Sequence, residues 1–123
     1  TASVRCAANA LGTFEKLNYP ENRTTLILNW PFKGKGLPRA GIESALKREL
    51  GVVIPYAGDA VVASILYGKP SVLQTPLDPL GAFLEDLAYL FSKEDHKKSA
   101  PENAGAGLIR VKERMHARQE KPT

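Results

Sequence analysis

The stretch TTLILN at residues 24–29 decides the fold class, because nearly every residue in it is apolar or β-branched. Such a run is typical of a strand covered on both faces in a parallel sheet. A shorter apolar stretch, VVI at residues 52–54, is ended by Pro55. A loop and a helical pattern separate the two stretches, as in a crossover between parallel strands. We therefore predict that the two strands lie side by side, parallel, inside a larger sheet.

Helical patterns surround both strands. Apolar residues recur at helical spacing in four segments, at residues 4–17, 38–50, 59–67 and 79–91. Gly51 is expected to cap the end of the second helix, and Asp59 and Asp78 to cap the starts of the third and fourth. The predicted order is α-β-α-β-α-α, a partial doubly wound parallel α/β sheet.

Length and composition indicate one small domain with a hydrophobic core. The chain has 123 residues, of which 43% are hydrophobic, and domains commonly run to about 100–200 residues. No run of about 18 apolar residues occurs, and the first residues do not resemble a signal peptide. The single cysteine, Cys6, excludes an internal disulfide and a cysteine-based zinc site. We expect a cytoplasmic protein in which Cys6 is buried and inert.

The net charge of +4 is concentrated near the C-terminus. Residues 1–92 hold 9 Lys/Arg and 8 Asp/Glu, whereas residues 93–123 hold 8 Lys/Arg and 5 Asp/Glu. A nearly neutral body does not favour a nucleic-acid platform. We predict a linker at residues 92–106 and a basic tail at residues 107–123. Residues 107–119 are expected to form either a basic amphipathic helix that contacts an anionic inner membrane weakly or a disordered or loosely helical, solvated segment.

Several short motifs, in their order and spacing, resemble MinD/ParA-family P-loop ATPases, closest to the CpaE/TadZ pilus-assembly branch. The resemblance covers roughly residues 2–91. It is carried by Tyr19-Pro20 with TLILN at 25–29, GVVIP at 51–55, AV at 60–61 with YGKP at 67–70, and TPLDP at 75–79 with LEDLA at 84–88.

The resemblance implies that residues 1–91 are the C-terminal portion of an ATPase domain. In that family, ATP with Mg²⁺ lies at the carboxyl ends of parallel strands, held by a glycine-rich phosphate loop. This sequence has no GxxxxGK[ST] frame, so the chain alone is not expected to be catalytic. The implied partners are a second copy or the N-terminal half of the same ATPase, and a protein of a polar or septal assembly. The implied role is spatial positioning in pilus assembly, cell division or partitioning.

The resemblance also implies a base-binding site around the two strand ends. The candidate residues are Asn29, Trp30, Pro55, Tyr56, Ala57 and Asp59. The family's equivalent of Asn29 bonds the adenine edge, and an amide suits this task because it offers a donor and an acceptor. Tyr56 is a candidate for stacking on a ring. Trp30 departs from the family, which often has arginine there.

Each candidate has a structural alternative. Asn29 is also a suitable strand-end residue, Tyr56 a half-buried surface aromatic, and Asp59 above all a helix cap. Trp30 either closes the pocket or packs under the following loop. The adjacent pair Glu85-Asp86 is expected to be a solvated helix face, because neighbouring helical residues do not face each other. The rival function is a non-catalytic protein-interaction module.

Overall fold

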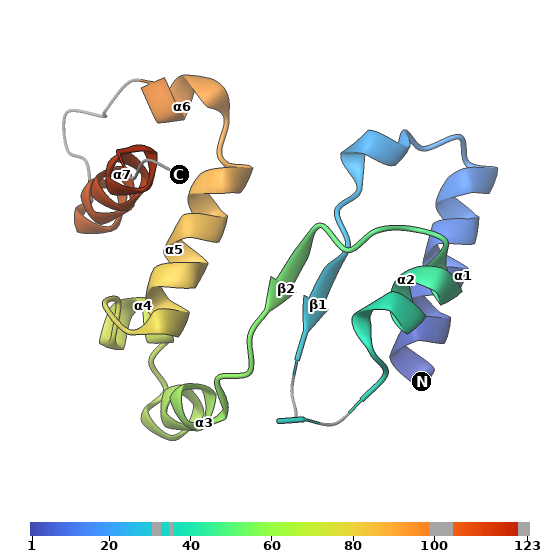
Figure 1. Ribbon diagram of the computed structural model, residues 1–123, viewed down its shortest axis with the longest axis horizontal. Coiled ribbons are helices and arrows are strands. Elements are labelled where there is room, and N and C mark those ends of the chain that lie inside the picture. Colours follow the sequence, from blue (N-terminus) through green and yellow to red (C-terminus); the bar gives the residue numbers. More distant parts are fainter. Residues whose placement is uncertain (31–32, 35, 99–104, 121–123) are drawn as a thin grey trace. The chain divides into compact units, whose positions relative to one another are not determined.

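The computed structural model describes residues 1–30, 33–34, 36–98 and 105–120 (Figure 1). The chain divides into two compact units, Thr1–Tyr56 and Ala57–Thr123. The division does not coincide with the predicted boundary at residue 91, because the basic tail belongs with the helices of the second unit. Each unit is described by itself.

The first unit holds a small parallel sheet and its helices. Its elements are α1 (Ala2–Lys16), the 3₁₀ turn η1 (Glu21–Arg23), β1 (Ile27–Asn29), α2 (Arg39–Leu46) and β2 (Val52–Ile54). The strands pair in parallel, with Ile27 opposite Val52 and Asn29 opposite Ile54. The prediction of two adjacent parallel strands is confirmed. β1 is shorter than predicted, because its partner offers only three residues for pairing.

β1 is not covered on both faces within the first unit. Along β1, Ile27 and Asn29 are exposed and Leu28 between them is half-buried. Successive side chains of a strand point to opposite faces, so one face of β1 is open. Ile27 is 45% exposed. Within the first unit, β1 therefore lacks, on one face, the cover that its apolar sequence predicts in a larger sheet.

α2 ends earlier than predicted, and Gly51 does not cap it. The cap is Lys47, in the left-handed conformation at φ 51° and ψ 32°. The chain then turns back because Glu43 Oε1 accepts the Leu50 N–H at 2.9 Å and the Arg39 Nε–H at 2.9 Å. The Leu50 N–H bond, followed by the Arg39 bond, holds the pKa of Glu43 below its usual value. Leu50 is thereby buried in the connection to β2.

The second unit is helical in its described residues (Figure 1). It contains α3 (Gly58–Tyr67), α4 (Ser71–Gln74), α5 (Pro79–Phe91), α6 (Glu94–Lys98) and α7 (Ala106–Gln119). The sequence did not predict α4 or α6, and α6 lies inside the predicted linker. Residues 99–104 of that linker lie outside the described residues, and its last residue, Ala106, is the first residue of α7.

Of the helix caps predicted in the second unit, one is confirmed and one is wrong. Asp78 is the N-cap of α5 as predicted, although its side chain makes no cap hydrogen bond. Gly68 ends α3 at φ 63°, as its freedom at positive φ allows. Asp59 is not the cap of α3: the N-cap is Ala57, and Asp59 lies in the first turn.

Close packing between short elements organises the second unit. Leu80 and Val111 are its buried apolar residues, at 7% and 2% exposure, among those the structure describes. The hydroxyls of Ser64 and Ser71 lie 2.6 Å apart and join α3 to α4. At Gly81 in α5, a Cβ atom would lie 2.4 Å from the Thr75 carbonyl oxygen, so α5 packs directly against the backbone that precedes it.

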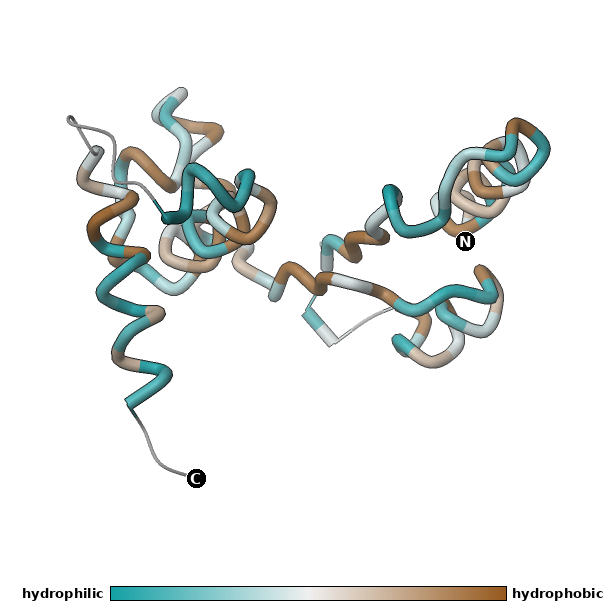
Figure 2. Tube along the Cα trace, turned by 90° about the horizontal axis from the view of Figure 1, so that it is seen from above, coloured by the Kyte–Doolittle hydropathy of each residue, from teal (hydrophilic) through white to brown (hydrophobic). Residues whose placement is uncertain are grey.

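The described part of the basic tail is helical rather than disordered. α7 is mostly hydrophilic along its length, ending next to the C-terminal label in Figure 2, yet it buries Val111. Residues 121–123 lie outside the described residues. No helix of the described residues is long and apolar enough to cross a bilayer.

Candidate functional site

The parallel register brings four of the six predicted site residues to one edge of the sheet. Asn29 ends β1 directly opposite Ile54, the last residue of β2. The Trp30 N–H donates to the Ile54 carbonyl oxygen at 3.4 Å. Pro55 and Tyr56 therefore leave β2 at the edge where Trp30 leaves β1. We call Asn29, Trp30, Pro55 and Tyr56 the carboxyl edge.

Two side chains of the carboxyl edge are available to a ligand. Asn29 is exposed, and its amide makes no hydrogen bond within the described part of the chain. Tyr56 is 45% exposed. Trp30 is half-buried, and its Cζ2 would lie 4.0 Å from a Cβ atom placed on Gly36. The indole thus lies against the following loop, which favours the loop-packing interpretation of Trp30.

The other two candidates belong to the second unit. Ala57 is the N-cap of α3 and is half-buried, and Asp59 lies exposed in the first turn of that helix. They are described with α3 and not with the carboxyl edge. Of the six predicted site residues, the structure therefore brings only Asn29, Trp30, Pro55 and Tyr56 together.

A hollow that the sequence did not reveal lies elsewhere in the first unit. Its volume is about 490 Å³, and it is lined by α1, by Tyr19, Glu21 and Thr24, and by the end of α2 with Lys47 and Arg48. Its polar lining includes Thr24, which precedes β1, and Arg48, which precedes β2. The hollow is thus at the amino ends of the strands, opposite the carboxyl edge. The only sequence signal was the pair of aromatic residues Phe14 and Tyr19, whose ring centroids are 5.4 Å apart.

Arg48 in this hollow has a structural role. Its Nη2 donates to the carbonyl oxygens of Glu21 and Thr24, each at 3.1 Å. Its Nε lies 2.9 Å from the Glu21 carboxylate. These bonds fasten the segment before β1 to the connection after α2. The guanidinium therefore fixes the entry of both strands into the sheet.

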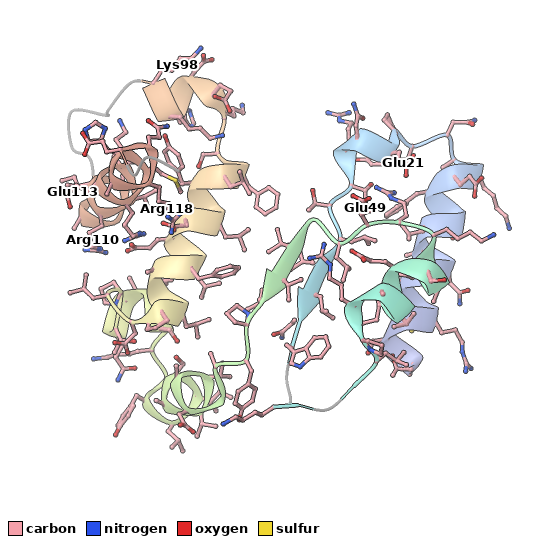
Figure 3. All side chains as sticks on the ribbon, viewed as in Figure 1. Glu21, Glu49, Lys98, Arg110, Glu113 and Arg118 are labelled. Atoms are coloured by element: carbon pink, nitrogen blue, oxygen red, sulfur yellow. The ribbon has the colours of Figure 1, made fainter. Side chains whose placement is uncertain are left out.

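The densest charged group lies between α5 and α7. We call it the arginine cluster, made of Arg110, Arg114 and Arg118 on α7 with Glu85 and Asp86 on α5. Figure 3 labels Arg110 and Arg118 on α7. Arg110 pairs with Glu85, and Arg118 Nη2 lies 2.8 Å from Asp86 Oδ2. Arg114 bridges the carboxylates, with Nη2 at 3.0 Å from Glu85 and Nε at 2.8 Å from Asp86.

The arginine cluster corrects the expectation of a solvated Glu85-Asp86 face. The side chains of these carboxylates are only 9% and 14% exposed. Glu85 and Asp86 are covered although adjacent helical residues do not face each other, because a single neighbouring helix supplies guanidinium groups to both carboxylates. Those groups stand four residues apart on α7, which places them along one side of the helix.

The electrostatics of the cluster argue against acid–base chemistry. The hydrogen bond from Arg110 lowers the pKa of Glu85 most, burial opposes this, and the bond from Arg114 lowers it further. The bond to Glu85 in turn raises the pKa of Arg110. A carboxylate held ionised in this way does not carry a proton near neutral pH. The cluster is therefore an interhelical fastening.

Two further sequence expectations concern sulfur and metal ligands. Cys6 is exposed on α1, so the prediction of a buried thiol is wrong. α1 has no buried residue, so no face of this helix is packed closely enough to cover the thiol. Among the described residues, no group of three or more His, Cys, Asp or Glu side chains is arranged to hold a metal ion.

Comparison with known proteins adds no relative to this picture. No family model matches the chain, and neither a curated protein nor a solved structure matches it. What the chain demonstrably shares with α/β proteins is a parallel strand pair joined through a helix, within a largely helical chain.

Proposed function

We propose that residues 1–91 act as the C-terminal portion of a MinD/ParA-type P-loop ATPase domain, of the CpaE/TadZ branch, and that the carboxyl edge contacts the adenine of ATP. The observation that supports this most is the parallel register, which brings Asn29 and Tyr56 to one edge. Ligands of open parallel sheets bind at the carboxyl ends of the strands.

The chemistry of the carboxyl edge suits a nucleobase. The Asn29 amide offers one donor and one acceptor to the edge of adenine, and it has no competing bond within the described residues. The exposed part of the Tyr56 ring offers a face for stacking. Phosphate and Mg²⁺ binding would come from the phosphate loop of the N-terminal half, so this chain alone would not hydrolyse ATP.

The open strand face supports the proposal of a completing partner. A two-stranded sheet is marginal by itself, and Ile27 leaves apolar surface uncovered. Additional strands of a parallel layer would extend the sheet at its edges, and the helices that connect them would cover this face. The proposed partner is the N-terminal half of the same ATPase, in the cytoplasm, with a role in positioning pili, division sites or replicons.

Membrane contact by residues 107–119 is a weaker part of the proposal. Three arginines of α7 are held by Glu85 and Asp86, so the charge available to anionic lipid is less than the sequence suggests. Lys112 is a remaining cation on this helix and has no ion-pair partner within the described residues. Any such contact would be peripheral and sensitive to salt.

A complementation experiment tests the ATPase proposal. The chain is mixed with the N-terminal half of a CpaE-type ATPase that carries the phosphate loop, and ATP–Mg²⁺ binding is measured by calorimetry. Binding by the mixture, weakened by Asn29→Ala but not by the matched surface change Asn22→Ala, is expected. A mixture that binds no more ATP than the N-terminal half alone would contradict the proposal.

A non-catalytic interaction module is the second candidate, favoured by the apolar surface of the second unit. Ile65, Leu66, Leu73 and Leu77 are each at least 75% exposed. Under this function, ATP and ADP leave the melting temperature unchanged. A nucleotide bound to the folded chain at a hundredfold excess over Kd would instead stabilise it by about 2.7 kcal/mol.

A further inference from the structure

The hollow of the first unit offers unfilled space beside polar groups that have no partner. Its volume of about 490 Å³ lies within the range of about 300–1,000 Å³ that is usual for small-molecule sites. The end of α2 forms one side of it. Residues of α1 at spacings of three and four, which share one side of a helix, form another: Ala8, Leu11, Gly12 and Glu15.

Gly12 leaves the α1 side of the hollow open. A Cβ atom at this position would meet nothing within 4 Å, although Gly12 is half-buried and belongs to the lining. The space beside it is therefore large enough to hold further atoms. Glycine inside a helix is destabilising relative to alanine, so the opening coincides with a local cost to α1.

Phe14 and Tyr19 give the hollow an aromatic lining. Their ring centroids are 5.4 Å apart, and the ring planes are inclined by 40°. The two residues are 38% and 46% exposed, so each keeps uncovered ring surface. Aromatic rings attract one another in offset or edge-to-face arrangements, and a third ring in the hollow would extend this pair.

Two charged residues of opposite sign in the lining have no partner. Glu15 lies in the last turn of α1, and Lys47 is the C-cap of α2. Neither makes an ion pair within the part of the chain that the structure describes. The Glu15 carboxylate also stands near the negative end of the α1 dipole, which disfavours it. A cation bound beside Glu15 would relieve this repulsion.

Arg48 has donors left for a ligand in the same lining. Its Nη2 and Nε are engaged by Glu21 and Thr24, whereas its Nη1 makes no hydrogen bond to the described residues. Lys47 and Arg48 thus form a cationic side of the hollow, and Glu15 on α1 an anionic one. The carboxylates of Glu15 and Glu21 balance the two cations, so the hollow favours a ligand without net charge.

We propose that this hollow binds an aromatic α-amino acid in its zwitterionic form. The ring packs on Phe14 and Tyr19, the ammonium group meets Glu15, and the carboxylate meets Lys47 and the Nη1 of Arg48. The site lies at the amino ends of the strands, away from the carboxyl edge. It goes beyond the proposed ATPase function, and each of the two can fail without the other.

A matched set of probes tests each part of the arrangement. Ligand-observed NMR titration of the full chain gives dissociation constants for L-tryptophan, indole-3-propionate, tryptamine and glycine. L-Tryptophan is expected to bind with a Kd on the order of 1 mM, as suits a ligand of its size in a half-open site. The probes that lack the ammonium or the carboxylate group should bind roughly three- to tenfold more weakly, and glycine should not bind measurably. Tryptophan that does not bind, or that binds no better than these two probes, would overturn the proposal.

A filling substitution shows whether the hollow itself is the site. Gly12→Leu is expected to abolish measurable tryptophan binding, because leucine occupies the open space beside α1. Leucine also favours a helix more than glycine does, so this variant should melt at a higher temperature, and its loss of binding is not due to unfolding. Gly12→Ala, which adds one methyl group, is the matched control and should bind as before. Undiminished binding by Gly12→Leu would place tryptophan elsewhere and refute the proposal.

Two charge substitutions assign the ends of the ligand. Glu15→Gln should weaken tryptophan and tryptamine but not indole-3-propionate. Lys47→Asn should weaken tryptophan and indole-3-propionate but not tryptamine, and asparagine tolerates the left-handed conformation of this position. Glu49→Gln, outside the lining, is the control and should change none of the three. Equal weakening of all three ligands by Glu15→Gln or Lys47→Asn would contradict the assigned orientation.

Discussion

The two units of the chain use arginine in different ways. In the first unit, Arg39 donates to the Leu50 carbonyl oxygen and Arg48 to those of Glu21 and Thr24. In the second unit, Arg110 bonds to the covered carboxylate of Glu85, and Arg114 bonds to those of Glu85 and Asp86. The first pattern fixes chain turns next to short strands, and the second fastens two long helices. The difference teaches that the arginines of the first unit hold backbone turns as well as exposed or partly exposed carboxylates, whereas those of the second unit hold covered carboxylates on a neighbouring helix.

Removing the central carboxylate is expected to have the largest effect on this contrast. Glu85→Gln leaves two guanidinium groups with a neutral partner in a largely covered site. Because the arginines are themselves about a quarter exposed, the expected cost is about 1–3 kcal/mol, below that of a fully buried pair. Urea unfolding measures it.

The matched change in the first unit is Glu43→Gln. It removes a carboxylate that is bound to Arg39 and to the Leu50 N–H, but the amide oxygen can still accept the backbone bond. A smaller loss than for Glu85→Gln is expected. Equal losses in the two variants would mean that the arginine cluster is no more important than a local turn.

Two helical glycines, one in each unit, differ in how closely other atoms approach them, and alanine substitutions test this difference. A Cβ atom at Gly81 would meet the Thr75 carbonyl oxygen and Pro76 Cα at 2.4 and 2.9 Å. These are backbone atoms and cannot move aside easily. Gly81→Ala is therefore expected to destabilise by about 1–3 kcal/mol, measured by thermal unfolding. Gly12→Ala is the control: nothing lies within 4 Å of its Cβ position in α1, and alanine there should stabilise by about 0.5–1 kcal/mol.

The arginine that fastens the strand entry gives a smaller expected effect. Arg48→Lys keeps the charge but loses the planar group that donates to two carbonyl oxygens and the Glu21 carboxylate. A loss of about 1 kcal/mol is expected, since each net hydrogen bond is worth roughly that amount. Lys47→Arg, at the neighbouring exposed position, is the control. An unchanged urea midpoint for Arg48→Lys would show that these bonds are dispensable.

Much of the element order was predictable, because it rests on local patterns. The apolar run that includes Leu28 and the proline after Ile54 gave both strands, and helical spacing around Leu80 gave α5. The cap at Lys47 was not predictable, because a non-glycine residue in the left-handed conformation leaves no sequence signal. α4 was missed because four residues are too few to show periodicity.

The candidate site was predictable only where it follows from strand pairing. Asn29 and Tyr56 lie at the same edge of the sheet because parallel strands end together. The arginine cluster was missed because Arg114 and Asp86 are 28 residues apart, and no local rule pairs them. The charge of the tail was visible in the sequence, but its neutralising partners on α5 were not.

Acid is expected to weaken each unit through one carboxylate with a lowered pKa, and this effect is the smallest expected near neutral pH. Both Glu85 and Glu43 have folded-state pKa values below the ordinary carboxyl value. Their stabilising effect is therefore fully present above the unfolded pKa of about 4.3 and is lost as the pH falls through the folded pKa. Glu85→Gln and Glu43→Gln should each flatten this acid loss, measured by urea unfolding from pH 7 to pH 3. High salt should weaken the cluster at pH 7 only slightly, because covered pairs are poorly screened. A steep salt dependence at neutral pH would mean that Glu85 is solvated in solution, and the contrast between the units would then disappear.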